Sequence, residues 1–215
     1  MITFIDAAAD LLLGSTCAGC RSPGWGVCRG CLDLLRTPPH AFGGPDGLPV
    51  VAAGPYRPVL EHLIPRYKDD GALHLERLLA ELLAGALAVA RPAPDTLLVP
   101  VPSLPRNVRA RGFDHARRLA RRLASDSGLK SAALISRDRR GHDQAGLGRS
   151  DRSTNLECTM KARPPRYPVL VIDDVITTGA TIREACRSLE RVGADVLGAV
   201  VIAQVDDYPP GRTKA

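Results

Sequence analysis

One stretch of the chain, residues 169–181, constrains fold and chemistry more than any other. Residues 169–172 form a continuous apolar run, as expected for a central parallel strand covered on both faces. Asp173 and Asp174 follow directly, and ligands of open α/β sheets bind at this carboxyl end of the strands. Because two adjacent carboxylates do not enter a core unpaired, we expect both acids to face solvent or a ligand.

The residues after the acid pair are suited to holding a phosphate. Small hydroxyl residues and a glycine lead into a helix, where free backbone N–H groups and the positive end of the helix dipole favour an anion. These residues are Thr177, Thr178, Gly179, Ala180 and Thr181. The stretch therefore predicts a strand, loop and helix that hold a sugar phosphate. The bland alternative is an ordinary strand–turn–helix with a Thr N-cap.

The same stretch resembles the ribose-5-phosphate-binding signature of type I phosphoribosyltransferases, which use phosphoribosyl pyrophosphate (PRPP). The resemblance implies that Asp173 and Asp174 hold the ribose 2′- and 3′-hydroxyls and that residues 177–181 cradle the 5′-phosphate. Family members that act on 6-oxopurines carry an Asp as general base at the position of Thr177, whose hydroxyl cannot act as a base near neutral pH. This difference argues against a hypoxanthine or guanine acceptor and leaves orotate-like, amine-like or unknown acceptors open.

Strands alternate with helices through most of the chain, as in a doubly wound, mostly parallel sheet. We expect strands at 48–53, 96–101, 131–135, 169–172 and 196–205, and helices at 59–64, 75–86, 113–124 and 180–191. An apolar content of 45% supports a sizeable core. The prediction is an α/β type I phosphoribosyltransferase fold over residues 48–208, with a small N-terminal zinc-binding module and a flexible tail over 209–215.

Residues 1–47 are expected to form that separate module, with a short helix at 4–13 and a Pro-rich linker from residue 36 onward. Two CxxC pairs lie between them, formed by Cys17, Cys20, Cys28 and Cys31. Four thiolates suit tetrahedral Zn²⁺ and leave no open position for catalysis, so the expected site is structural. With few core residues nearby, the metal would supply the folding free energy of this segment. The alternatives are surface thiols or redox pairs, although a redox CxxC usually opens a helix in a βαβ unit.

A four-cysteine module before a phosphoribosyltransferase domain resembles the ComF family, which is linked to competence for DNA uptake. The resemblance runs from about residue 11 to residue 205. Its landmarks include Lys68 and Gly71 of a Lys-x-x-Gly element and the Val-Pro-Val-Pro run at 99–102. Residues 111–116 match Arg-Gly-Phe-Asn-Gln-Ala, with Asp114 and His115 in place of Asn and Gln. The last landmarks are Gln144, Leu147, Arg152 and Asn155.

Arginines near these landmarks are candidates for binding pyrophosphate, which needs cations and backbone donors. Arg106, Arg109 and Arg111 follow a strand end, where a pyrophosphate loop is expected. A long polar loop at 137–155 carries Arg149 and Arg152 and would close over the reaction. The candidate catalytic residues are therefore Asp173, Asp174, Arg111, Arg149 and Arg152, and Arg106 and Arg109 join the PRPP-binding set. Mg²⁺ would bridge pyrophosphate oxygens and ribose hydroxyls.

Three further side chains receive no catalytic assignment. His115 is expected to be a surface or helix-start residue, and neither His142 nor Cys158 has an identifiable role. Cys186 shares an apolar helix face with Ile182, Ala185 and Leu189 and is expected to be a small buried hydrophobe.

Three functions stay open at this stage. The first is an Mg²⁺-dependent transferase with an unknown acceptor, and the second is a non-catalytic regulator that responds to PRPP. The third is a single-stranded-DNA-binding uptake factor that works with a competence helicase or another uptake partner. The third draws on a net charge of +6 and on a basic helix face formed by Arg117, Arg118, Arg121 and Arg122. Single-strand binders usually add stacking aromatics, and only Trp25 and Phe113 are near candidate surfaces.

No apolar run approaches the ~18 residues of a membrane span. The N-terminus lacks the basic segment of a signal peptide. We therefore expect a cytoplasmic protein without membrane insertion, in which the six cysteines are thiols or metal ligands and not disulfides.

Overall fold

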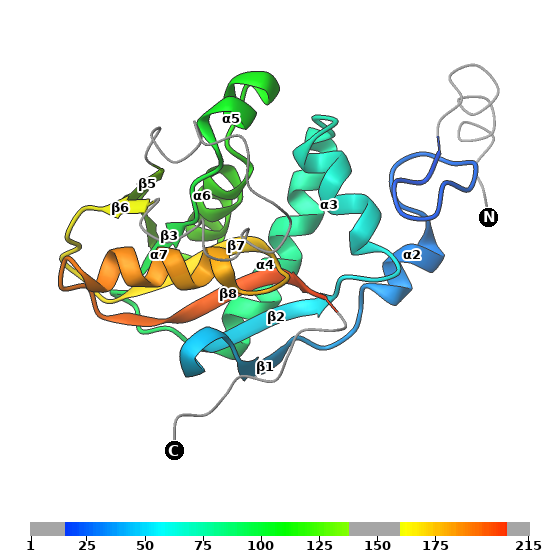
Figure 1. Ribbon diagram of the computed structural model, residues 1–215. Helices are drawn as coiled ribbons and strands as arrows, with labels where there is room; N and C mark the ends of the chain where they lie inside the picture. Colours follow the sequence, from blue (N-terminus) through cyan, green and yellow to red (C-terminus); the bar gives the residue numbers. More distant parts are fainter. Residues whose placement is uncertain (1–15, 138–159, 206–215) are drawn as a thin grey trace.

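The computed structural model describes residues 16–137 and 160–205, and its centre is a six-stranded sheet (Figure 1). Across the sheet the strands are β1 (His40–Gly43), β2 (Pro49–Pro55), β8 (Val196–Gln204), β7 (Val169–Ile176), β3 (Leu97–Pro100) and β4 (Lys130–Ser131). All neighbours pair in parallel except β1, which runs antiparallel to β2. A separate antiparallel pair is formed by β5 (Ile135–Arg137) and β6 (Met160–Ala162). The predicted α/β fold with a mostly parallel sheet is confirmed.

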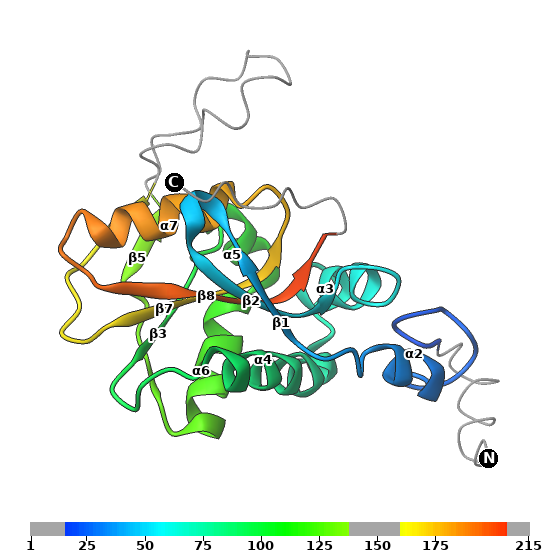
Figure 2. The same cartoon turned by 90° about the horizontal axis from the view of Figure 1, so that it is seen from below.

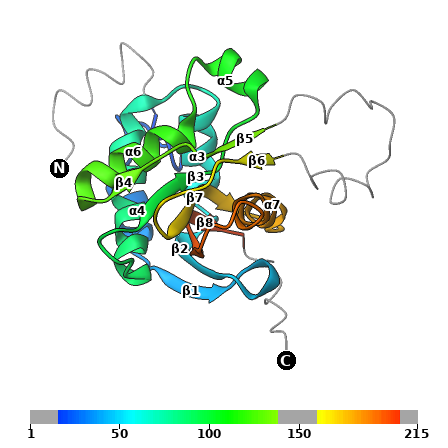
Figure 3. The ribbon, with the colours of Figure 1, turned by 90° about the vertical axis from the view of Figure 1, so that its left-hand side faces the viewer.

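Helices cover both faces of this sheet (Figures 2 and 3). One face carries α3 (Leu60–Lys68), α4 (Glu76–Ala90) and α6 (His115–Ser127), and the other carries α7 (Ala180–Glu190). Two shorter helices, α2 (Arg29–Leu34) and α5 (Pro105–Arg111), and the 3-10 turns η1 (Pro45–Gly47) and η2 (Leu73–Leu75) complete the described elements.

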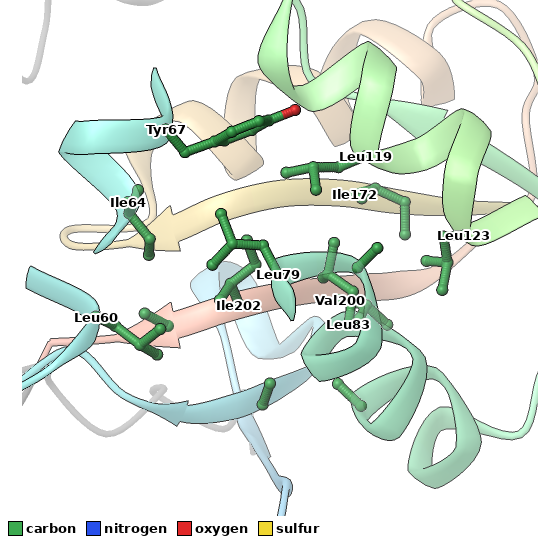
Figure 4. Close-up of a cluster of buried hydrophobic side chains, with 14 of the residues drawn as sticks. Leu60, Ile64, Tyr67, Leu79, Leu83, Leu119, Leu123, Ile172, Val200 and Ile202 are labelled. Atoms are coloured by element: carbon green, nitrogen blue, oxygen red, sulfur yellow. The ribbon is translucent and has the colours of Figure 1, made fainter. Parts of the chain in front are cut away.

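The helix that the apolar periodicity predicts at 75–86 forms as α4, and its apolar face packs into the core. Leu79 and Leu83 of α4 are fully buried and lie over Val200 and Ile202 of the central strand β8 (Figure 4). A second buried cluster fills the space between the sheet and α7, where Cys186 packs beside Ile182, Ala185 and Leu189. Cys186 is therefore the small buried hydrophobe that its position on the helix predicts.

Several boundaries differ from the expectations. The Pro-rich segment expected as a linker contains β1, whose register with β2 pairs Phe42 with Val50. The pyrophosphate loop expected after the strand at 96–101 contains α5, and the strand expected at 131–135 is split between β4 and β5. The helix expected at 4–13, the long loop at 137–155 beyond Arg137, and the tail at 209–215 lie outside the described residues.

The largest difference concerns β7, which does not stop before the acids. It continues to Ile176, and within it Asp173 pairs in register with Val201 of β8. The carboxylates are thus held by a regular strand and not by a loop.

The longest helix in the described ranges, α4, has 15 residues, and none there is both long and apolar enough to cross a membrane.

Candidate active site and metal centre

The acid pair is buried inside the protein. Asp173 is 8% exposed and Asp174 is 5% exposed, so neither faces open solvent, and both line a cleft that is open to a ligand. Part of the cost of burial is offset by the backbone: the Asp174 N–H donates to Asp173 Oδ1 at 2.9 Å, and the Val175 N–H donates to Asp174 Oδ1 at 2.8 Å.

The second oxygen of Asp174 binds two cationic or polar donors. Lys68 Nζ, at the end of α3, lies 2.9 Å from Asp174 Oδ2, and His115 Nε2, at the start of α6, lies 3.0 Å from the same atom. A carboxylate oxygen has two lone pairs, so Oδ2 is fully used by these two donors. Three elements far apart in sequence therefore meet at one atom.

The two neighbouring carboxyls have opposite pKa shifts. Burial, together with the charge of Asp174, raises the pKa of Asp173 well above its usual range. Burial alone would also raise the pKa of Asp174, but the hydrogen bond from His115 and the charge of Lys68 outweigh it and lower that pKa. Burial lowers the pKa of Lys68, and the Asp174 carboxylate more than reverses this effect. Of the two carboxyls, Asp174 is therefore the one that ionises more readily.

His115 connects Asp174 to a second cation. Its Nδ1 lies 3.0 Å from Ser103 Oγ and 3.3 Å from Arg111 Nη1. A guanidinium only donates, so this contact favours the tautomer in which Nδ1 accepts and Nε2 carries the hydrogen directed at Asp174. His115 is the first residue of α6, as one expectation has it, but it is only 4% exposed and is not a surface residue.

Helix α6 begins at this point because Asp114 caps it. The Asp114 Oδ1 atom accepts from the Arg117 N–H at 3.3 Å, which satisfies a free donor of the first turn. The replacement of the family's Asn by Asp114 thus leaves a capping residue in place. The cap fixes where His115 enters the site.

A cleft opens over the acids. From the predicted phosphate loop, residues 177–181, Thr177 and Thr181 line it, and so do the cations Lys68, Arg111 and Arg137. Gly179, with a φ of 74°, takes a left-handed conformation at the N-cap of α7, and this lets the chain turn from the loop into the helix. Thr178 Oγ1 accepts from the Ala180 N–H at 3.4 Å.

The predicted arginines fall in different places. Arg111 lies in the cleft and bonds through Nη2 to Asp69 Oδ1 at 2.9 Å. Arg109 lines a neighbouring cavity, and Arg106 is exposed on α5 and lines neither. Arg149 and Arg152 lie outside the described residues.

Sequence reasoning did not place four residues of the cleft. Lys68 and His115 carry a signal, because both belong to landmarks of the family resemblance. Ser103 and Arg137 have no sequence signal of their own, since each is an ordinary polar residue beside a strand.

The four cysteines of the N-terminal module come together as predicted. Their Sγ atoms all lie within 4.8 Å of one another, with Cys17 3.8 Å from Cys31 and Cys20 3.6 Å from Cys28. Tetrahedral zinc with Zn–S bonds of about 2.3 Å requires S–S separations of about 3.8 Å. The N–H groups of Gly19 and Cys28 point at Cys17 Sγ, at 3.4 and 3.2 Å, as donors do toward a thiolate. The cluster therefore fits a four-thiolate metal site.

Comparison with known proteins now adds to this geometry. The family profile described as "Phosphoribosyl transferase domain" matches residues 108–214. Competence protein F of Haemophilus influenzae is 28% identical, over 79% of this chain and 86% of its own length. DNA utilization protein YhgH of Salmonella typhi is 29% identical, over 86% of this chain and 94% of its own length.

The expected resemblance to the ComF family is confirmed, because both relatives match most of the chain and the phosphoribosyltransferase domain matches its second half. Among solved structures, adenine phosphoribosyltransferase from Rhodothermus marinus is similar, with 21% identity, a TM-score of 0.38, and coverage of 82% of this chain and 88% of that one. The fold of this chain is shown by its own strand order and by the matched domain.

The basic helix face formed by arginines of α6 is partly engaged within the molecule. Arg118 bonds to Glu76 and lies over the Phe113 ring, 5.7 Å from its centroid, and Arg122 bonds to Asp126 at 2.9 Å. Phe113 also packs beside Tyr67 against the core, so its ring is not free to stack on a base. Trp25, 66% exposed, lies on the cysteine module.

Proposed function

We propose that this protein is a Mg²⁺-dependent phosphoribosyltransferase that binds PRPP in the cleft over Asp173 and Asp174. The observation that carries the proposal is the buried acid pair of β7 beside the phosphate loop, with Lys68 and Arg111 in the same cleft. Burying two carboxylates costs folding free energy, so such a pair in a cleft indicates a ligand-binding role. Ribose hydroxyls can donate hydrogen bonds to these carboxylates.

In this proposal each part of PRPP meets a suited group. The 5′-phosphate binds residues 177–181 and the N-terminus of α7. The acceptor's lone pair attacks C1 of the ribose, the C1–O bond to pyrophosphate breaks, and its electron pair leaves with pyrophosphate. Because positive charge builds on the ribose and negative charge on the leaving group, Lys68 and Arg111 stabilise the departing pyrophosphate. A bound Mg²⁺ would neutralise part of the pyrophosphate charge.

We infer that Lys68 changes partner when PRPP binds. Asp174 Oδ2 already accepts from two donors, so a ribose hydroxyl can bind there only if one of them leaves. The His115 side chain is 6% exposed and fixed at a helix start, whereas the Lys68 side chain is 32% exposed on a long flexible stem. Lys68 is therefore the donor that moves, and its ammonium then meets the pyrophosphate.

The remaining assignments belong to the same proposal. Zn²⁺ binds the four cysteines and has a structural role, because all four tetrahedral positions are taken by protein. Arg149 and Arg152, and the loop arginine Arg106, are candidates for further pyrophosphate contacts, whereas Arg109 lines the neighbouring cavity. We place the protein in the cytoplasm, where PRPP is made.

Calorimetric titration of the zinc-loaded protein with PRPP and Mg²⁺ tests the site. We expect binding in the parent and a loss of at least 100-fold in affinity when Asp173 and Asp174 are both changed to Ala. Asp126→Ala, at an exposed ion pair on α6, is the control and keeps the parent affinity. PRPP binding that survives the double change would refute the site.

A second candidate function is the handling of single-stranded DNA, and the names of the two relatives favour it. Arg117 and Arg121 are the members of the basic face that form no ion pair with another described residue. If DNA is a ligand, its affinity falls steeply with salt and falls further in Arg117→Gln with Arg121→Gln. A DNA affinity that is unchanged in this variant excludes the face as the contact. PRPP binding without turnover would instead favour the regulator.

A further inference from the structure

A second cavity adjoins the cleft that holds the acids. It has a volume of about 490 Å³ and lies between the end of β3, helix α5, the start of α6 and strand β5. Pro102, Ser103 and Arg137 line both spaces, so the cavity and the cleft share a wall. Its size falls within the range of small-molecule sites, roughly 300–1,000 Å³.

The cavity combines apolar walls with cations. Pro105, Val108 and Ile135 provide apolar surface, and the guanidinium-bearing side chains of Arg109 and Arg117 reach the same space. Neither of these two arginines forms an ion pair with another residue in the described ranges. Their charges are therefore available to a ligand.

Arg137 adds a third and less exposed cation. Its Nε donates to the Pro102 carbonyl at 2.9 Å, which fixes the guanidinium at the shared wall. Burial lowers the pKa of Arg137, because the neighbouring acids do not fully offset the removal of its charge from water.

The acid in the lining does not cancel these cations. Asp114 Oδ1 accepts from the Arg117 N–H and from Ser103 Oγ, at 3.3 and 3.2 Å, so this carboxylate is engaged in capping α6. Among the described residues of the lining, three arginines accompany one acid, which leaves an excess of positive charge.

We propose that this cavity is the acceptor subsite and that the acceptor is a small planar ring bearing a carboxylate. This inference rests on the proposed function. The apolar walls suit a ring, and a guanidinium pairs with a carboxylate through two parallel hydrogen bonds. A neutral base would leave the arginines unpaired, and free pyrophosphate would leave the apolar walls unused. No aromatic residue is among the described residues of the lining, so the stacking that single-stranded nucleic acid requires is absent there.

The chemistry balances without a further reactant. A ring or amine nitrogen of the acid, bound in the cavity that adjoins the cleft, attacks C1 of PRPP. The new N–C1 bond forms, and the C1–O bond breaks with its electrons passing to pyrophosphate. A proton on the attacking nitrogen, where there is one, passes to solvent. The carboxylate stays bound to the arginines and takes no part in bond making.

Calorimetry with matched pairs of probes tests the inference on the full zinc-loaded chain with PRPP and Mg²⁺. The pairs are orotate with uracil, nicotinate with nicotinamide, and benzoate with benzamide. In each pair the carboxylate is the main difference. We expect the acids to bind at least tenfold more tightly than their neutral partners, and Arg117→Gln to weaken the acids at least fivefold. The same variant keeps the parent affinity for PRPP, and Arg121→Gln, on an outward position of the same helix, keeps both affinities.

The outcomes separate the two proposals. If PRPP binds but no acid is preferred over its neutral partner, or if Arg117→Gln changes nothing, the acceptor inference is overturned and the proposed function stands. If the acids bind through Arg117 but PRPP does not bind, the cavity stands as an acid site and the transferase reading falls. If an oligothymidylate binds, Arg117→Gln weakens its binding, and no acid binds, then the cavity is a nucleic-acid contact and the inference fails.

Discussion

At the scale of single residues, the site depends on one carboxylate oxygen. Asp174 Oδ2 joins Lys68 and His115, while Asp173, next in the chain, has no cation of its own within hydrogen-bond distance among the described residues. Two carboxyls with nearly equal burial therefore have opposite pKa shifts. The difference follows from which side chain the neighbouring helices bring to each of them.

Asp173→Asn should stabilise the fold and weaken PRPP binding. Because the pKa of Asp173 is raised in the folded state, its carboxyl is favourable when protonated, and this contribution is lost as pH rises through the folded pKa. Asn keeps the oxygen that accepts from the Asp174 N–H and carries no charge. We expect a gain of about 1 kcal/mol near neutral pH, or roughly 2–4 °C in Tm for a chain of this size.

Thermal melts from pH 4 to 8, without added divalent cations, measure this effect. The gap between variant and parent should widen as pH rises from the unfolded carboxyl pKa of about 3.9 and become constant above the folded one. A gap that narrows with rising pH would show that Asp173 is ionised and paired in the folded protein.

His115→Gln and His115→Leu should behave differently. Gln is the residue that the ComF pattern has at this position, and its amide can donate to Asp174, so PRPP affinity should stay within about threefold of the parent. Leu removes the donor from a buried charge, which costs about 1–3 kcal/mol. We expect a PRPP affinity at least tenfold weaker and a lower Tm, both from calorimetry. Equal PRPP affinities in the two variants would show that His115 does not contribute to PRPP binding.

At the scale of elements, local sequence patterns predicted the helices and strands with strong periodicity. The apolar face of α4, the basic and apolar faces of α6, and the apolar runs of β7 and β8 all reappear at nearly the expected positions. Two of the elements that were not predicted, β1 and α5, lie in Pro-rich segments. The strand β1 exists through its pairing with β2, and α5 starts at Pro105, a residue that suits the first turn of a helix as well as a loop.

The site was only half predictable for a related reason. The motif at 173–181 is contiguous, so one strand, loop and helix reveal it. The partners of Asp174 come from α3 and α6, and only the three-dimensional packing shows that Lys68 and His115 reach the same atom. Burial of the acids could not be foreseen without those partners, because an unpaired buried carboxylate is unstable.

Gly179→Ala tests the phosphate loop as an element. A residue with a Cβ at a φ of 74° costs about 1 kcal/mol, and the strain falls on the turn that presents the backbone N–H groups. We expect a PRPP affinity at least tenfold lower. Gly128→Ala is the matched control, since Gly128 has a φ of 73° at the C-cap of α6, with no atom within 4 Å of an added Cβ. It should lose similar stability and keep PRPP binding; equal effects on binding would refute the loop assignment.

At the scale of the whole molecule, the cysteine module is joined to the main core. Cys17, Ala18 and Cys31 are buried in the same apolar cluster as Val59 and Leu60, which lead into α3. A Cβ on Gly19 would come within 3.1 Å of Val59, so the knuckle packs closely on that helix start. Metal binding and the stability of the larger domain are therefore linked.

Cys20→Ser should release zinc and lower the Tm of the entire protein. A four-thiolate site that loses one ligand loses much of its metal affinity, and the folding free energy that the metal supplies is lost with it. We expect less than one tenth of the parent zinc content by elemental analysis and a fall in Tm of at least 5 °C. Cys186→Ala, away from the cluster, keeps the zinc. A metal-free variant that melts like the parent would show that the module is held by packing alone.

The span of the recognised domain and the span of the working site do not coincide. The match covers residues 108–214, whereas Lys68 lies on α3 and β2 supplies the neighbour of β8. A chain cut to the matched residues would leave Asp174 Oδ2 with one side-chain donor, His115, in place of two, and would expose an edge of β8. A unit that keeps this arrangement must therefore begin before β2. The matched residues leave out helix α3, whose last residue, Lys68, forms the ion pair with Asp174.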